Sequence, residues 1–273
     1  MYAEMSDGAR VYYELHGDHD NPLLVVLNGI MMSTTSWQSF IEPLSRHFSL
    51  LLVDQRDQGR SDYMDRQYDI ELHARDLEEL FISIDAKEVN LLGVSYGGQI
   101  AELYALEFGE RLNSLILSNT VARITPYLAE LGEAWKEAAR LNDGERFFTL
   151  AIPFIYSDSF YNTNLAWLKS RQKAFKELLT EEWFKGFCRL ASSNIDFSVV
   201  DRLNEIKVPT LLLAADRDIV TPVEEMELLH AKIPDSELLI IHDAGHAAFL
   251  EKQEEFLTAV TGFVIKKTSK RRA

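Results

Sequence analysis

Leu91-Leu92-Gly93-Val94-Ser95-Tyr96-Gly97-Gly98 carries the motif G-x-S-x-G between an apolar run and a helical pattern. The apolar run, residues 89–94, predicts a short buried strand, and the apolar spacing after the serine predicts a helix. A serine at such a junction lies on a sharp turn, where a Cβ at Gly93 or Gly97 would collide with neighbouring backbone. The pattern indicates that Ser95 is a nucleophile. A glycine- and serine-containing turn without chemistry would have the same five letters.

Short apolar runs alternate with helical patterns along most of the chain. Continuous runs such as 23–27 and 48–53 are typical of strands covered on both faces. The alternation predicts an α/β fold with a mainly parallel, doubly wound sheet and helices on both of its faces. The expected strands are 11–15, 23–27, 48–53, 89–94, 114–117, 210–214 and 237–241, and the expected helices are 37–44, 70–84, 96–108, 223–233 and 254–264.

The alternation breaks between residues 121 and 205, where helical periodicity continues without a clear strand. This segment is rich in aromatic residues, and Lys207-Val208-Pro209 then restarts the strand pattern. We therefore expect a core of residues 1–120 and 206–273, with a helical cap of residues 121–205 inserted on top of the sheet. Most aromatic side chains of the cap should form its own core, and a few should line a cavity beneath it.

The amino-acid composition, and the net charge above all, excludes some classes of binding partner. The chain has 273 residues, 47% of them hydrophobic, and a formal net charge of −15. This acidic balance argues against nucleic acids and anionic membranes as partners. No apolar stretch approaches the roughly 18 residues that span a bilayer, and the start of the chain does not resemble a signal peptide.

Cys188 is the single cysteine, so no intrachain disulfide is possible. This fits a reducing compartment, and the thiol is expected to pack as a small apolar group. We expect a soluble cytoplasmic protein, a monomer or a homodimer, that takes a small-molecule substrate. The basic stretch at residues 266–272 is expected to be a frayed, solvated terminus.

A serine hydroxyl needs a base to take its proton, and that base needs an acceptor to orient it. Of the seven histidines, His246 is the expected base. It lies just after the last strand run, and Gly245 lets the chain turn there. The loop leaves the carboxyl edge of the sheet, where Ser95 should also lie. His242 competes as a residue at the end of the strand, with a side chain that could point into the packing.

The orienting acid should lie between serine and histidine in chain order. The strand at 210–214 is followed by a loop that contains two aspartates. Asp218 is the expected acid because it lies deeper in the loop, before the run that leads into the next helix. Asp216 is the alternative, although it could instead bond its own turn or pair with Arg217.

The charge that develops on a substrate carbonyl oxygen needs two aimed N–H donors. The backbone N–H of Tyr96, directly after the nucleophile, is one expected donor, and that of Ile30 is the other. Gly29 allows close approach of the backbone. Met31 and Met32 are apolar and deformable, which suits a substrate pocket as well as ordinary packing.

In this order, the segments resemble the α/β-hydrolase superfamily over nearly the whole chain. The resemblance implies a Ser–His–Asp triad, a helical cap at residues 121–205, and no metal or organic cofactor. The matching segments are Asn28-Gly29, Asp54-Gln55-Arg56-Asp57-Gln58-Gly59-Arg60-Ser61-Asp62, Gly93-Val94-Ser95-Tyr96-Gly97-Gly98, Asp218-Ile219-Val220-Thr221-Pro222 and Gly245-His246.

Two positions depart from the common pattern of that superfamily. Many members have His-Gly where this chain has Asn28-Gly29, and Asn there, with the following Trp37, is similar to the enol-lactone hydrolase branch. Many members also have glycine at the position of Asp57, whose side chain is expected to change the loop and add negative charge near the site. A serine nucleophile argues against the haloalkane dehalogenase and epoxide hydrolase branches.

These observations predict a serine hydrolase, of esterase or lactonase type, that cleaves a small or medium carboxylic ester or lactone. An acyltransferase or a perhydrolase would use the same acyl-enzyme with another acceptor. A low-turnover ligand-binding or signalling protein on this fold is a third hypothesis, which the intact set of Ser95, Asp218 and His246 disfavours. The aromatic cap favours an apolar substrate part, and Arg56 or Arg123 could contact an anionic one.

Overall fold

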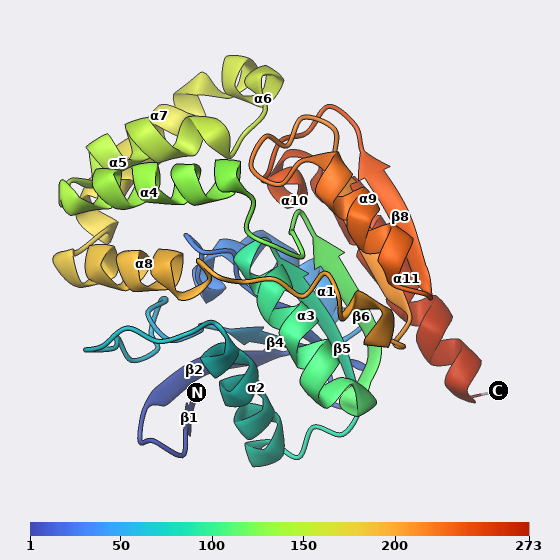
Figure 1. The fold of residues 1–273 in the computed structure, drawn as a ribbon. Coiled ribbons are helices and arrows are strands. Elements are labelled where there is room, and N and C mark those ends of the chain that lie inside the picture. The colour runs from blue at the N-terminus through green and yellow to red at the C-terminus, as the bar shows by residue number, and fades with distance from the viewer. Residues whose placement is uncertain (273) are drawn as a thin grey trace.

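The computed structural model describes residues 1–272 and contains one eight-stranded sheet in the order β1-β2-β4-β3-β5-β6-β7-β8 (Figure 1). β2 pairs with β1 and β4 in antiparallel fashion, and the other neighbouring strands are parallel. The mainly parallel α/β sheet predicted from the sequence is confirmed. The strands are β1 (Tyr2–Glu4), β2 (Arg10–His16), β3 (Leu23–Leu27), β4 (Ser49–Val53), β5 (Val89–Val94), β6 (Leu112–Ser118), β7 (Thr210–Ala215) and β8 (Ser236–Ile241).

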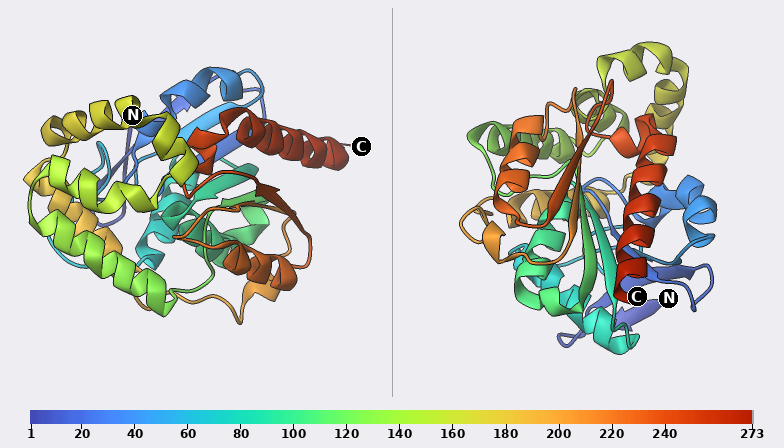
Figure 2. Two further views of the ribbon diagram at one scale, coloured as in Figure 1. Left: turned by 90° about the horizontal axis from the view of Figure 1, so that it is seen from above. Right: turned by 90° about the vertical axis from the view of Figure 1, so that its right-hand side faces the viewer.

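Helices cover both faces of this sheet, as Figure 2 shows. On one face α2, α3 and α9 pack onto the strands, and on the other face α1 and α11 do so. β4, β5, β6 and β7 are buried along their whole length, which explains why their sequences are largely apolar. These helices are α1 (Gln38–Ser45), α2 (Glu71–Ser83), α3 (Tyr96–Phe108), α9 (Val223–Lys232) and α11 (Gln253–Arg272), and the short α10 (Ala248–Glu251) precedes α11.

Five further helices lie between β6 and β7 in the chain and stand over the carboxyl ends of the strands (Figure 1). They enclose an apolar cluster of their own that includes Trp135, Phe147, Phe184 and Phe187, and Cys188 packs against it. The cap boundaries given above remain a prediction, but the segment is helical as expected. The helices are α4 (Pro126–Arg140), α5 (Gly144–Ala151), α6 (Asp158–Thr163), α7 (Leu165–Leu178) and α8 (Glu181–Ser193).

The two ends of this helical segment are joined to each other. The backbone N–H of Val199 donates to Ala122 at 2.8 Å, and that of Ile124 donates to Phe197 at 3.0 Å. Arg123 and Ser198 form an isolated antiparallel bridge between them. The chain therefore enters and leaves the five helices side by side.

The structure differs from the sequence-based prediction at both ends of the chain. β1 was not predicted, because only one of its three residues, Ala3, is buried and the apolar signal is weak. The basic tail is not a frayed terminus, since α11 continues to Arg272. Lys266 and Lys267 form ion pairs with Glu237 on β8, which neutralise charge along this part of the helix. Among residues 1–272, no helix is both long and apolar enough to cross a bilayer.

Candidate active site

Ser95 lies on a sharp turn between β5 and α3, with φ +54° and ψ −117°. Such a conformation is strained for a residue other than glycine and persists only where its surroundings hold it. Ser95 N–H donates to the carbonyl of Ser118 at 2.9 Å. The carbonyl of Ser95 accepts from Gly98 N–H and from Thr120 Oγ1, both at 2.8 Å. The turn is therefore fixed on both sides of the serine.

The two glycines of the motif are required by close backbone contacts. A Cβ on Gly93 would lie 2.2 Å from the carbonyl oxygen of Gly97. A Cβ on Gly97 would lie 2.7 Å from the carbonyl oxygens of Leu27 and Asn28. Any other residue at either position would push α3 away from β3 and β5, so the glycines let the serine stand at the carboxyl edge of the sheet.

Ser95, His246 and Asp218 form one hydrogen-bonded chain. Ser95 Oγ lies 2.9 Å from His246 Nε2, and His246 Nδ1 lies 2.8 Å from Asp218 Oδ2. They come from the end of β5, from the loop before α10 and from the loop after β7, and 151 positions separate Ser95 from His246. This geometry suits transfer of the serine proton to the imidazole.

Asp218 is fully buried and is held by donors that the sequence did not single out. Asn119 Nδ2 donates to it at 2.9 Å and Thr221 Oγ1 at 2.7 Å, and the backbone N–H groups of Val220 and Thr221 donate to its other oxygen. Burial works against ionisation, but the His246 charge and the hydrogen bonds from His246 and Thr221 outweigh it. The pKa of Asp218 therefore lies below its usual value.

The competing candidates lie elsewhere. Asp216 accepts hydrogen bonds from His242 Nδ1 at 2.9 Å and from the backbone N–H of Asp243 at 2.7 Å. The His242 side chain is 81% exposed, so it does not point into the packing. Arg217 pairs with Asp158 and Asp243 rather than with Asp216.

One expected oxyanion donor, Ile30, lies in the loop after β3, and the other, Tyr96, is the first residue of α3. Ile30 lines the same two cavities as Ser95, and Tyr96 directly follows Ser95 in the chain. Within residues 1–272, the backbone N–H groups of Ile30 and Tyr96 donate to no other protein atom. Gly29 is fixed because its N–H donates to Met32 Sδ at 3.3 Å and its carbonyl accepts from Gln58 Nε2 at 3.0 Å.

The side chain of Asn28 holds the start of this loop in place. Its side chain is fully buried; its Nδ2 donates to the carbonyl of Val53 at 2.8 Å, and its Oδ1 accepts from Trp37 Nε1 at 2.8 Å. The asparagine thus connects the end of β3 to β4 and to Trp37, the residue before α1. The residue noted in the sequence as a departure has a structural role in this molecule.

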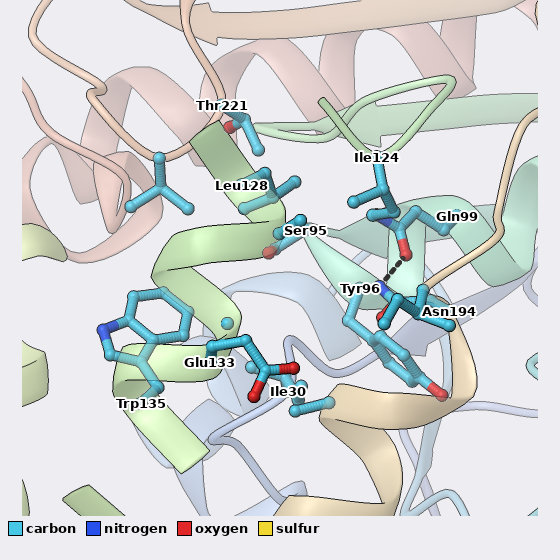
Figure 3. Close-up of a pocket in the computed structure, with 15 residues that line it drawn as sticks. Ile30, Ser95, Tyr96, Gln99, Ile124, Leu128, Glu133, Trp135, Asn194 and Thr221 are labelled. Carbon is cyan, nitrogen blue, oxygen red and sulfur yellow. Dashed lines mark hydrogen bonds between the residues drawn. The ribbon is translucent and has the colours of Figure 1, made fainter. Parts of the chain in front are cut away.

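Two cavities meet at Ser95, Ile30 and Trp135. The larger has a volume of about 450 Å³ and contains Gly29 and His246. The smaller has a volume of about 60 Å³ and is shown in Figure 3. The lining of the larger cavity is mostly apolar and includes Met31, Met32, Ile155, Trp167, Phe175 and Phe249.

Arg56, Asp57 and Arg123 do not line either cavity, so their side chains make no direct contact with these cavities. Arg56 is buried and pairs with Asp7 and Asp76. Asp57 is buried and accepts from Arg189 Nη2 of α8 at 2.6 Å. These charges are paired within the protein because an unpaired buried charge is costly.

Arg123 lies between β6 and α4, at the bridge that joins the two ends of the helical segment, and it forms an ion pair with Glu225. Among the described residues, the one group of side chains spaced to hold a metal ion is Asp18, His19 and Asp20. All three are exposed, and none of them lines the cavities at Ser95.

Comparison with known proteins is consistent with this geometry. Residues 22–253 match the family described as "alpha/beta hydrolase fold". The chain is 24% identical to 3-oxoadipate enol-lactonase 1 of Acinetobacter baylyi, over 94% of each chain. It is 28% identical to the proline iminopeptidase of Saccharolobus solfataricus, over 94% of this chain and 89% of the relative.

The solved structure of MGS-M2, an alpha/beta hydrolase enzyme from a Medee basin deep-sea metagenome library, has a TM-score of 0.93 to this chain. It is 31% identical, and the match covers 97% of both chains. The relatives are named for different substrates, so the similarity extends to the fold and the hydrolase class rather than to one substrate.

Proposed function

Because this chain belongs to the α/β-hydrolase family, we propose that it hydrolyses small or medium carboxylic esters or lactones through an acyl-enzyme on Ser95. The observation that carries the proposal is the hydrogen-bonded chain from Ser95 Oγ through His246 to Asp218. The enol-lactonase relative adds support for ester and lactone chemistry.

In the first half-reaction, Ser95 Oγ bonds to the substrate carbonyl carbon as its proton moves to His246 Nε2. Asp218 holds the imidazole by Nδ1–H and stabilises its positive charge. The N–H groups of Ile30 and Tyr96 bind the oxyanion. The bond from carbon to the leaving oxygen then breaks, and His246 gives its proton to that oxygen.

In the second half-reaction, water attacks the acyl carbon and loses a proton to His246. The bond from Ser95 Oγ to carbon breaks, the carboxylic acid leaves, and the proton returns to the serine. An acyltransferase or perhydrolase would place an alcohol or peroxide where the water attacks. Product analysis with added alcohol or peroxide separates these activities from hydrolysis.

The test is intact mass after treatment with a fluorophosphonate probe, on wild type and Ser95→Ala, together with a screen of esters and lactones. We expect one adduct on wild type only, and a fall in turnover of about 10⁴-fold or more in Ser95→Ala. Equal turnover by Ser95→Ala would contradict the mechanism. A folded wild type with no adduct and no turnover would favour the ligand-binding hypothesis.

A further inference from the structure

The smaller cavity contains two amide side chains that the proposed mechanism does not use. Gln99 lies on α3 and is 4% exposed, and Asn194 directly follows α8. Asn194 Nδ2 donates to Gln99 Oε1 at 2.7 Å. Figure 3 shows this pair on one side of the Ser95 hydroxyl and Trp135 on the other.

One hydrogen bond between two amides occupies one NH₂ group and one carbonyl oxygen, and it leaves the other NH₂ group and the other oxygen unused. Among residues 1–272, Gln99 Nε2 donates to no protein acceptor, and Asn194 Oδ1 accepts from no protein donor. Exchanging oxygen and nitrogen in both side chains would again leave one donor and one acceptor. The pair therefore offers a ligand both a donor and an acceptor at the wall of this cavity.

No other lining side chains of this cavity form such a pair, although Trp135 Nε1 is a buried donor without a partner among the described residues. Ile124, Leu128 and Ile195 are apolar. The one carboxylate, Glu133, forms an ion pair with Lys136. A hydroxyl group suits the free amide groups because it donates and accepts at once, without bringing a charge.

His246 lines only one of the two cavities, and this difference indicates which half of an ester each cavity binds. His246 must protonate the leaving oxygen, and it lines the larger cavity but not the smaller one. The alcohol half therefore belongs in the larger, mostly apolar cavity and the acyl half in the smaller one. Gln99 is four residues beyond Ser95, which is about 6 Å along the helix axis, within reach of a short acyl chain.

We propose that Gln99 and Asn194 are specificity-determining residues that select a short acyl group bearing a hydroxyl. This inference rests on the proposed function, because it takes Ser95 as the point of acyl transfer. The favoured substrate is an ester of a short hydroxy acid with an apolar alcohol. The amide pair binds the hydroxyl, and the larger cavity binds the alcohol.

The test compares hexyl 3-hydroxybutanoate, as separate enantiomers, with hexyl 3-methylbutanoate, which has a methyl group in place of the hydroxyl. We expect wild type to favour the better hydroxy enantiomer by about tenfold in kcat/KM. Gln99→Leu and Asn194→Leu should bring the ratio near one. Circular dichroism and urea unfolding check that both variants fold, and Gln172→Leu, an amide change outside both cavities, should leave the ratio unchanged.

A ratio near one in wild type, or one that both leucine variants preserve, would overturn the inference. Reversed esters, 3-hydroxybutyl and 3-methylbutyl hexanoate, test the assignment of the two halves. If wild type favoured 3-hydroxybutyl over 3-methylbutyl hexanoate and the two leucine variants lost that preference, the amide pair would contact the alcohol half. The assignment of the acyl half to the smaller cavity would then be wrong. An active wild type that ignores the hydroxyl refutes only this inference. A wild type that neither cleaves esters nor reacts with the fluorophosphonate refutes the proposed function as well.

Discussion

Replacing Asp57 with glycine sets two structural effects against each other. Asp57 has a φ of +64°, in the left-handed region that glycine adopts without strain, so Asp57→Gly should relieve about 1 kcal/mol. The same change removes the carboxylate that accepts from Arg189, from the Tyr68 hydroxyl at 2.8 Å and from the Met64 N–H at 2.9 Å.

The loss should exceed the gain. Removing one partner of a buried ion pair costs about 3–5 kcal/mol. The Arg189 side chain is 17% exposed, so some hydration is available to it and the lower end of that range applies. The Tyr68 hydroxyl loses its acceptor, which adds about 1 kcal/mol. We expect Asp57→Gly to lower the free energy of unfolding by about 3 kcal/mol.

Urea unfolding, followed by fluorescence and circular dichroism, measures this free energy. Arg189→Met provides the matched control, because it leaves the Asp57 carboxylate buried without its cation. The double variant should be much less destabilised than the two single changes added together. If Asp57→Gly were as stable as wild type, the pair between the core loop and α8 would contribute nothing, and the reasoning would be refuted.

Three other predictions concern single side chains. Ser95→Gly should be more stable than Ser95→Ala by about 1 kcal/mol, since glycine relieves the positive φ; equal urea midpoints would show that the turn is unstrained. Burial raises the pKa of Glu102 well above 4.5, and its carboxyl oxygens have no partner among the described residues. The native state thus keeps a proton that the unfolded state loses as pH rises, so Glu102→Gln should gain more stability over wild type at pH 8 than at pH 5, and a constant difference would contradict this. Asn119→Ala removes a donor to the Asp218 carboxylate, so kcat/KM should fall by about tenfold. The acidic limb of the plot of kcat/KM against pH should move to higher pH. An unchanged pH profile would argue against a role for Asn119 in stabilising the Asp218 carboxylate.

Local sequence signals led to the strands and to Ser95, because they depend on neighbours in the chain. The buried strands are largely apolar in sequence, and the serine of the motif directly follows one of them. Asp218 and His246 were found by their order and by their places after strands, and the structure brings both to Ser95.

Contacts between distant segments left no comparable signal. Asn119 reaches Asp218 across 99 positions, and Arg189 reaches Asp57 across 132. A charged side chain in a sequence does not indicate whether it faces a cavity or a partner inside the protein. For that reason Asp57 was expected near the site, and the amide of Gln99 was not singled out.

The paired stem at residues 122–124 and 197–199 has a consequence for how such a protein can diversify. Both ends of the helical segment meet at one backbone bridge, between Arg123 and Ser198. A segment of different length or sequence could be grafted between these two points without altering the register of β6 and β7. New substrate preferences could then arise by exchange of this single insert, while the machinery at the sheet edge is inherited intact.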